Sequence, residues 1–131
     1  MKSFYRIGII FIVIILLFLL VFYFFGNSSN ENKLEIRVEK YYEALKNQDY
    51  ATTYDMEHQF IRESFIKDEY INSDNKNTYG IVYFLIDNIT IKDTTAKVEL
   101  SMEVIYNHEK MYTQFSDYWI YENNNWYHAP N

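Results

Sequence analysis

The spacing of hydrophobic and polar positions divides this chain into three stretches. Residues 7–25 form an apolar run without a charged side chain. Residues 31–75 repeat their apolar positions every three or four residues, which is typical of amphipathic helices. From residue 81 the apolar positions recur at every second residue, the period of a β-strand. This order predicts an apolar N-terminal helix followed by an α+β body in which helices precede strands.

The apolar run from Ile7 to Phe25 is long enough for a transmembrane helix. At roughly 1.5 Å of rise per residue it covers about 28 Å, close to the ~30 Å thickness of the hydrocarbon layer. Lys2 and Arg6 precede the run, and the next charged residue after it is Glu31. Because positive charge stays on the cytoplasmic side, we expect a single-pass anchor of the cell membrane with a cytoplasmic N-terminus.

A cleaved signal peptide is the alternative to an anchor. Its apolar region should be about 7 to 15 residues long and end in a small-x-small site. The run is longer than that, although residues 26–28 form a weak cleavage site. The chain has no cysteine, which excludes a lipoprotein anchor and a disulfide framework. We expect residues 1–26 to hold the N-terminus and anchor, 27–30 a linker, and 31–131 one extracytoplasmic domain.

The first predicted helix of that domain runs from Glu31 to about Lys46. Asn30 is suited to cap it, because its side chain can accept a hydrogen bond from the first turn. Glu31 at the start and Lys46 at the end complement the helix dipole. Five apolar residues share the face expected to be buried: Leu34, Val38, Tyr41, Tyr42 and Leu45.

Two shorter helices are expected next. Asp49 can cap a helix from Tyr50 to about Glu57, and its buried side should hold Tyr50, Ala51 and Tyr54.

The third helix is expected from Lys67 to roughly Asn75, with Tyr70 and Ile71 facing inward. The stretch from His58 to Phe65 is ambiguous. Four apolar residues are expected to anchor this region: Phe60, Ile61, Phe65 and Ile66.

Three long strands and a short one are predicted after residue 80. Their alternation of apolar and polar residues is typical of an antiparallel sheet with one face packed and one wet. The expected strands are Ile81–Ile91, Ala96–Tyr106, Met111–Glu122 and Trp126–His128, joined by turns at 92–95, 107–110 and 123–125. The alternation slips near residues 118–120, where we expect a β-bulge. The domain is therefore predicted to pack about three helices on a curved meander of about four strands.

The charge balance of the domain argues against anionic partners. Residues 31–131 carry 10 basic and 18 acidic side chains, a net charge of −8. Such a surface repels nucleic acid and anionic lipid. Solubility near an anionic membrane accounts for this charge, and binding of a cationic partner is the alternative.

Three segments resemble the nuclear-transport-factor-2-like (cystatin-like cone) superfamily. Residues 38–51 are similar to its opening, where a helix ending in "fyeal" runs into a "gDy" turn. Residues 65–71 resemble its third helix, and residues 119–127 resemble its terminal hairpin. The likeness is greatest to small membrane-anchored domains of Gram-positive bacteria, including the lumazine-binding-like group and the non-catalytic domain of some penicillin-binding proteins. The resemblance implies architecture and location, and little about function.

A curved sheet around the first helix would leave an aromatic cavity suited to a small hydrophobic ligand or to a partner's side chain. We expect its lining to include Tyr41, Tyr54, Tyr83, Tyr106, Phe115, Asp117 and Trp119. In the alternative, side chains fill the cone and the exterior makes protein contacts, with Ile105 and Ile120 as candidates.

Enzymatic chemistry has weaker support. The superfamily that the sequence resembles includes isomerases and cyclases that place a carboxylate and a tyrosine inside the cone. No motif in this sequence marks such a pair. His58, His108 and His128 lack metal-ligand spacing, and His108 is most simply a turn residue. We therefore expect no catalytic, metal or cofactor site. The sequence predicts a non-enzymatic binding or assembly module with a protein partner at the envelope. The alternative is a pocketed ligand binder or an isomerase-like enzyme.

Overall fold

The computed structural model describes Ile15 and residues 29–73 and 79–129. The chain divides into two units, Met1–Asn30 and Glu31–Asn131, and the fold below is that of the second. The expected anchor, Ile7–Phe25, lies outside the described residues except for Ile15. No helix within the described ranges is long and apolar enough to cross a membrane.

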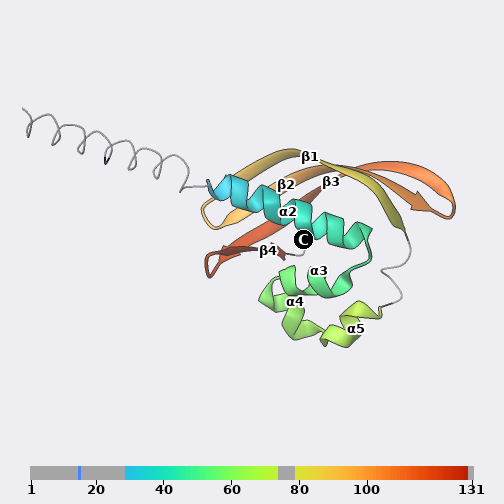
Figure 1. Cartoon of the computed structure of the whole chain (residues 1–131), viewed down its shortest axis with the longest axis horizontal. Coiled ribbons are helices and arrows are strands. Elements are labelled where there is room, and N and C mark those ends of the chain that lie inside the picture. The colour runs from blue at the N-terminus through green and yellow to red at the C-terminus, as the bar shows by residue number, and fades with distance from the viewer. Residues whose placement is uncertain (1–14, 16–28, 74–78, 130–131) are drawn as a thin grey trace, which may run out of the picture. The chain divides into compact units, whose positions relative to one another are not determined.

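In residues 29–73 and 79–129, four helices precede four strands (Figure 1). The helices are α2 (Asn30–Lys46), α3 (Tyr50–Met56), α4 (Gln59–Ser64) and α5 (Lys67–Ile71). The strands are β1 (Gly80–Lys92), β2 (Thr95–Tyr106), β3 (Glu109–Glu122) and β4 (Asn125–Ala129). Each strand pairs antiparallel with the next, in the order β1-β2-β3-β4. The predicted α+β class and the antiparallel meander are confirmed.

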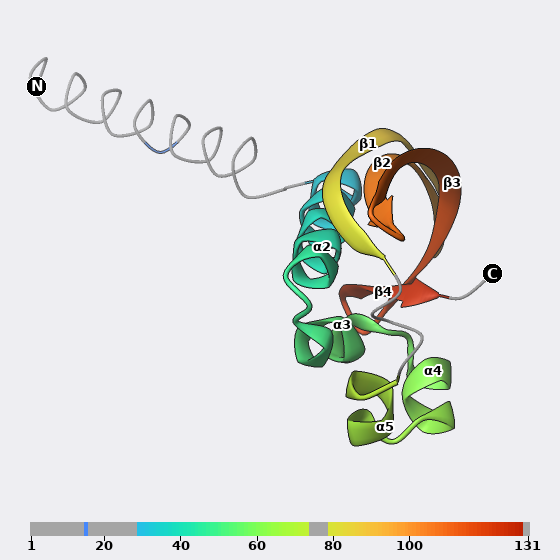
Figure 2. The same cartoon turned by 90° about the vertical axis from the view of Figure 1, so that its right-hand side faces the viewer.

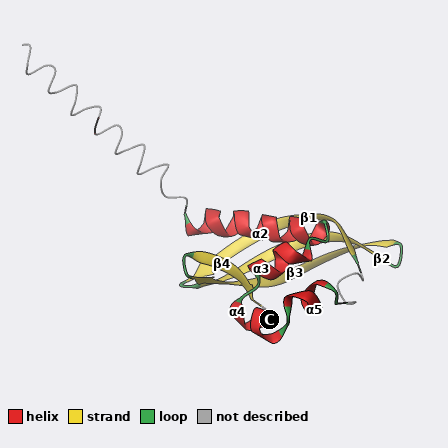
Figure 3. Cartoon of the chain, turned by 60° about the horizontal axis from the view of Figure 1, so that its bottom comes forward, coloured by secondary structure: helices red, strands yellow, loops and turns green. Residues whose placement is uncertain are grey.

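The long helix α2 runs along the curved sheet, whose strands curl strongly in the view of Figure 2. The three short helices lie to one side (Figure 3), and α3 contacts both α5 and β4. This arrangement leaves the C-terminal part of α2 and the adjoining sheet close to α3 and α5, where the site described below is found.

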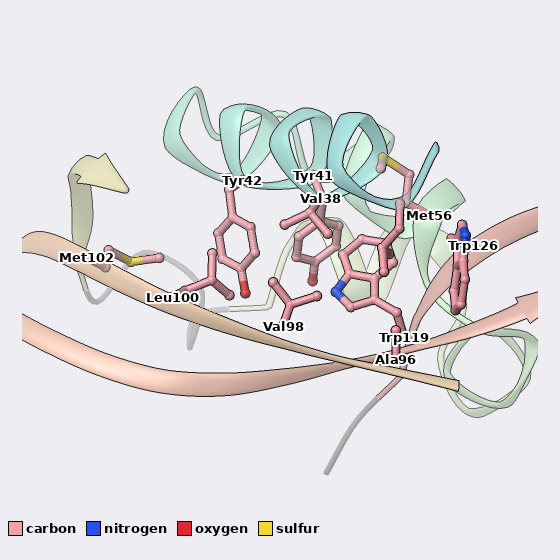
Figure 4. Close-up of a cluster of buried hydrophobic side chains, with 11 residues drawn as sticks. Val38, Tyr41, Tyr42, Met56, Ala96, Val98, Leu100, Met102, Trp119 and Trp126 are labelled. Atoms are coloured by element: carbon pink, nitrogen blue, oxygen red, sulfur yellow. The ribbon is translucent and has the colours of Figure 1, made fainter. Parts of the chain in front are cut away.

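The hydrophobic core lies between α2 and the inner face of the sheet (Figure 4). Its buried members are Leu34, Val38, Tyr41, Tyr42, Met56, Ala96, Val98, Leu100, Met102, Trp119 and Trp126. The predicted face of α2 is therefore confirmed, although Leu45 is only half-buried. Full burial of a side chain such as Leu34 contributes about 1.5–3 kcal/mol.

The turn between α2 and α3 sets the direction of the short helices. The backbone N–H of Gln48 donates to the carbonyl of Leu45, and that of Asp49 donates to Ala44 at 2.8 Å. This is the Schellman pattern, with Gln48 in the left-handed region at a φ of 59°. The Asp49 side chain accepts from the Thr52 backbone N–H at 3.1 Å, which confirms the predicted cap.

Two expectations for these helices were wrong. Helix α2 begins at Asn30, so Asn30 is its first residue and not the cap before it. In α3 the buried residues are Thr53 and Met56, and not Tyr50, Ala51 and Tyr54. The reason is that α3 faces both α5 and β4, and the side of the helix carrying Thr53 and Met56 lies between them.

The region after α3 forms a helix, α4, that contributes little to the core. Phe60, Phe65 and Ile66 were expected as anchors, but their exposed fractions are 64%, 49% and 68%. Ile61 is half-buried. Helix α4 has only six residues, none of them buried, so its apolar side chains contribute little to the core. Tyr70 of α5 is buried as predicted.

Strand β1 contains two β-bulges that keep its apolar residues on the inner face. The pairing with β2 shifts between Ile81 and Tyr83 and again between Ile86 and Asn88, so Val82 and Asp87 are the extra residues. The side chains packed against the core from β1 are Ile81, Phe84, Ile86, Ile89 and Ile91. Each bulge moves the alternation by one position.

Strand β3 has no such shift. It pairs with β2 residue by residue from Ile120 to Glu109, so the bulge predicted near residues 118–120 is wrong. The pattern of apolar residues is interrupted here because an acidic residue, Asp117, occupies a buried position between Phe115 and Trp119, where an apolar residue is usual.

The predicted turns are confirmed as two-residue hairpin loops. Asn107 and His108 have φ values of 49° and 68°, and Asn123 and Asn124 have 50° and 63°. Two consecutive residues with positive φ give the twist that matches hairpin strands, and asparagine tolerates this conformation. Asp93 in the first turn has a φ of 54°.

Candidate functional site

Two adjoining cavities lie where α2, the short helices and the sheet meet. The larger has a volume of about 430 Å³ and is lined by Tyr41, Leu45, Tyr50, Glu57, Ile61, Phe65, Tyr70, Ser73, Tyr79, Ile81 and His128. The smaller measures about 310 Å³ and is lined by Tyr41, Tyr42, Leu45, Tyr79, Ile81, Met102, Val104, Phe115, Asp117 and His128. We refer to them as the first and the second cavity. Both are partly open to solvent, and Tyr41 and His128 belong to both.

A buried polar cluster forms the wall between the two cavities. The imidazole of His128 lies between two carboxylates, with Nδ1 2.6 Å from Oε2 of Glu57 and Nε2 2.8 Å from Oδ1 of Asp117. Glu57 and Asp117 are both buried. We call Glu57, His128 and Asp117, with the tyrosines that bind them, the Glu57–His128–Asp117 cluster.

Three tyrosine hydroxyls complete the cluster. Tyr41 and Tyr70 both donate to Oε1 of Glu57 at 2.7 Å. Tyr42 donates to Oδ2 of Asp117 at 2.7 Å. Figure 4 shows Tyr41 and Tyr42 projecting side by side from α2 toward the sheet, so one helix supplies a donor to each carboxylate.

Backbone geometry brings the cluster together. His128 of β4 pairs with Trp119 of β3, and Asp117 lies two positions before Trp119 on the same face of the sheet, diagonal to His128. Glu57 follows α3 directly, and its backbone N–H donates to the carbonyls of Thr53 and Tyr54. Glu57 also forms a β-bridge with His128. The cluster thus connects the short helices to the sheet.

The surroundings of His128 decide its charge. Burial by itself lowers the pKa of His128, but the hydrogen bonds and the attraction from Asp117 and Glu57 outweigh burial and raise the pKa from 6.5 to about 9. His128 is therefore a cation at neutral pH, and both ring nitrogens donate. The tyrosine rings favour this cation, because Tyr41 stacks on the imidazole with ring centroids 4.6 Å apart.

The tyrosines stay neutral. Burial and the adjacent Glu57 carboxylate raise the pKa of Tyr41 well above its usual value, and burial beside Glu57 also raises the pKa of Tyr70. The pKa of Tyr42 is raised by burial and by Asp117. All three hydroxyls are therefore hydrogen-bond donors to carboxylates.

The predicted lining residues divide into two groups. Tyr41 lines both cavities, and Phe115 and Asp117 line the second. Trp119 is fully buried and packs edge-on against Tyr41 and His128, so it supports the wall without lining it.

The other predicted lining residues lie elsewhere. Tyr54 packs against Tyr70 and donates to the carbonyls of Arg62 and Phe65. Tyr83 and Tyr106 are 55% and 42% exposed and line neither cavity. The bulge at Val82 turns Tyr83 to the outer face, opposite Glu103.

Glu57, Tyr70 and His128 line the first cavity but are not among the predicted lining residues. His128 is two positions after the buried Trp126. The two-residue period of the short strand, which the sequence shows, places both side chains on one face of the sheet. No local sequence pattern marks Glu57 as a site residue, because its partner His128 is 71 residues away in the chain. Among residues 29–73 and 79–129, no group of three or more His, Cys, Asp or Glu side chains is arranged to hold a metal ion.

Comparison with models of known protein families gives no match, and comparison with curated proteins gives none. Solved structures do match. A SEC-C motif-containing protein from Rhodopseudomonas palustris is 12% identical, with a TM-score of 0.57 over 68% of this chain and 69% of that one. A Campylobacter jejuni protein, provisionally named an NTF2-like transpeptidase, is 15% identical, with a TM-score of 0.51 over 79% of this chain and 100% of that one. At these sequence identities, the similarity supports an NTF2-like fold for the chain and gives no information about its function.

The stability of the domain should depend on pH through His128. Because its pKa is about 9 in the folded state and 6.5 otherwise, the stabilisation is complete below pH 6.5 and is lost as the pH rises through 9. The loss should be roughly 3 kcal/mol in the free energy of unfolding. Urea denaturation of the full chain in detergent, followed by tryptophan fluorescence from pH 6 to 9.5, measures it. His128→Gln should lower stability and flatten this dependence, whereas the turn variant His108→Asn should keep it. A wild-type curve that stays level would contradict the assignment.

Replacing Tyr42 by Phe should destabilise the domain by about 1–3 kcal/mol, because it removes the hydroxyl that binds buried Asp117 and leaves a carboxylate oxygen unpaired. The same chemical change at Tyr83, which is 55% exposed, should alter stability by no more than about 0.5 kcal/mol. Urea midpoints of the two variants measured side by side test the difference. Equal effects would show that the Tyr42 hydrogen bond contributes nothing.

Proposed function

We propose that this protein is a non-enzymatic binding module that takes a small, largely apolar ligand in the first cavity. The observation that carries the proposal is the cavity of about 430 Å³ beside a buried polar cluster. Small-molecule sites in proteins usually enclose about 300–1,000 Å³, with mostly apolar walls and a few converging polar groups. The first cavity has these properties, since aliphatic and aromatic side chains surround Glu57 and His128.

The hydrogen bonds of the cluster favour binding over catalysis. A general base must reach a substrate proton with a free lone pair and a pKa near the working pH. Glu57 accepts from Tyr41, Tyr70 and His128. Asp117 accepts in the same way from Tyr42, His128 and the backbone N–H of Tyr118. Both carboxylates are engaged by groups of the protein itself, so an isomerase- or cyclase-like activity is the less favoured alternative.

We further propose that the module is held outside the cell membrane by residues 7–25. The length of that apolar run and the basic residues before it support this location. In this arrangement residues 31–131 form an extracytoplasmic domain, as in the membrane-anchored NTF2-like domains of Gram-positive bacteria that the sequence resembles. A contact with a protein partner is compatible with it, because Phe60 and Ile66 of the short-helix region are largely exposed.

Filling the first cavity should abolish ligand binding. Indole is a suitable probe, because it is small, neutral and aromatic. Full-length protein in detergent should bind it saturably, with NMR shift changes at Ile61 and Ile81, which line the first cavity. Ile81→Trp should remove this binding by occupying the space.

Ile105→Trp is the matched control, because Ile105 is 42% exposed and lines neither cavity. This variant should bind indole like the wild type. Because it is measured in the same detergent, it also controls for indole that partitions into the micelles. Equal binding by all three proteins would refute the cavity as the site.

The anchor should keep the intact chain in the membrane fraction. Leu16→Arg, near the centre of the apolar run, should reduce insertion, because a central arginine costs about 2.5–3.5 kcal/mol on the insertion scale. Leu16→Met should have no effect. Cell fractionation and intact-mass measurement test both variants. A wild-type chain that begins near Ser29 would indicate a cleaved signal peptide and overturn the anchor.

A further inference from the structure

We propose that the ligand of the first cavity is an organic cation, with an ammonium group attached to an apolar body that fits a space of about 430 Å³. This inference rests on the proposed binding function and specifies the chemical class of the ligand. It follows from the charges and the aromatic rings around the cavity, which are considered in turn.

The buried cluster carries one negative charge in excess. Glu57 and Asp117 are two carboxylates, and His128 between them supplies one positive charge. None of the described residues that line the first or the second cavity is Lys or Arg. A buried charge without a counter-charge is costly, so a cationic group in the cavity would be stabilised by the cluster.

Two basic side chains of the short-helix region, Lys67 and Arg62, have other partners. Lys67 forms an ion pair with Asp55 at 2.8 Å, and Arg62 lies over the ring of Tyr127 at 5.4 Å from its centroid. Neither lines the first cavity. Neither side chain therefore compensates the excess negative charge of the cluster.

The wall of the first cavity is rich in aromatic rings, which attract cations through their negative faces. Its aromatic members are Tyr41, Tyr50, Phe65, Tyr70 and Tyr79. The same attraction already operates within the protein. The ring of Tyr41 stacks on the His128 cation, and Lys67 Nζ lies 5.6 Å from the centroid of Tyr54.

The charge of the whole domain acts in the same direction. Residues 31–131 have a net charge of −8, which raises the local concentration of cations and lowers that of anions. An anionic ligand would meet repulsion both at the surface and at the cluster. A neutral ligand of equal size would gain only the apolar contacts.

Three probes with the same phenyl ring and two-carbon spacer separate these cases: phenethylammonium, 2-phenylethanol and 3-phenylpropanoate. Isothermal titration of full-length protein in nonionic detergent at pH 7 should give the highest affinity for phenethylammonium, about tenfold above 2-phenylethanol. The propanoate should bind most weakly.

A charge added to the cavity wall supplies the second test. Ser73 lines the first cavity, and Ser73→Lys should weaken phenethylammonium binding by about tenfold and strengthen binding of 3-phenylpropanoate. Ile36→Lys adds the same charge at an exposed position of α2 and should leave the order of affinities unchanged. Neither substitution replaces a member of the buried cluster, although Ser73→Lys removes the hydrogen bond from the Ser73 hydroxyl to the backbone carbonyl of Tyr70.

The outcomes separate the two proposals. If indole and 2-phenylethanol bind as tightly as phenethylammonium, the cationic ligand is excluded while the binding function stands. If Ser73→Lys leaves the phenethylammonium affinity unchanged, the charge argument is overturned. If none of the probes, indole included, binds the wild type, both the binding function and the cationic ligand are refuted.

Discussion

The imidazolium of His128, held between Glu57 and Asp117, is the interaction on which the rest of the domain depends. It joins the end of α3 to strands β3 and β4. Placing these charges inside the protein costs desolvation energy, which short hydrogen bonds from Tyr41, Tyr42 and others offset. Removal of one partner from such a cluster typically costs about 3–5 kcal/mol, because a buried charge is left uncompensated. The cluster therefore fixes how the short helices sit on the sheet.

The same cluster also forms part of the wall of the first cavity. Its polar atoms bind one another, so their hydrogen bonds are satisfied within the protein. The tyrosines that reach Glu57 do so through their hydroxyls, and their rings form the wall of the first cavity. The tyrosines thus satisfy the hydrogen bonds of Glu57 and also supply aromatic rings to the cavity wall. Both features favour selective binding over proton transfer.

Local features of the fold were predictable from the sequence, because each depends on a short-range period or on a residue's own conformational preference. The buried face around Val38, the alternation of β2 and the asparagine turns belong to this class. The exposure of Phe60 was not predictable, because burial depends on which surface an element meets. The pairing of Glu57 with His128 was not predictable either, since it joins positions far apart in the chain. The site was found only in part for this reason: Tyr41 and Asp117 carried local signals, whereas Glu57 did not.

The two bulges of β1 have a consequence for self-association. In the described sheet β1 and β4 are the edge strands, and β1 is long and rich in isoleucine. A long, flat and apolar edge strand can pair with a second molecule, and natural sheets prevent this with irregularities and charges on the edge strand. The extra residues Val82 and Asp87 break the regular ladder at two points, and the second adds a carboxylate. The irregularity that keeps the inner face of β1 apolar therefore also protects its free edge from aggregation.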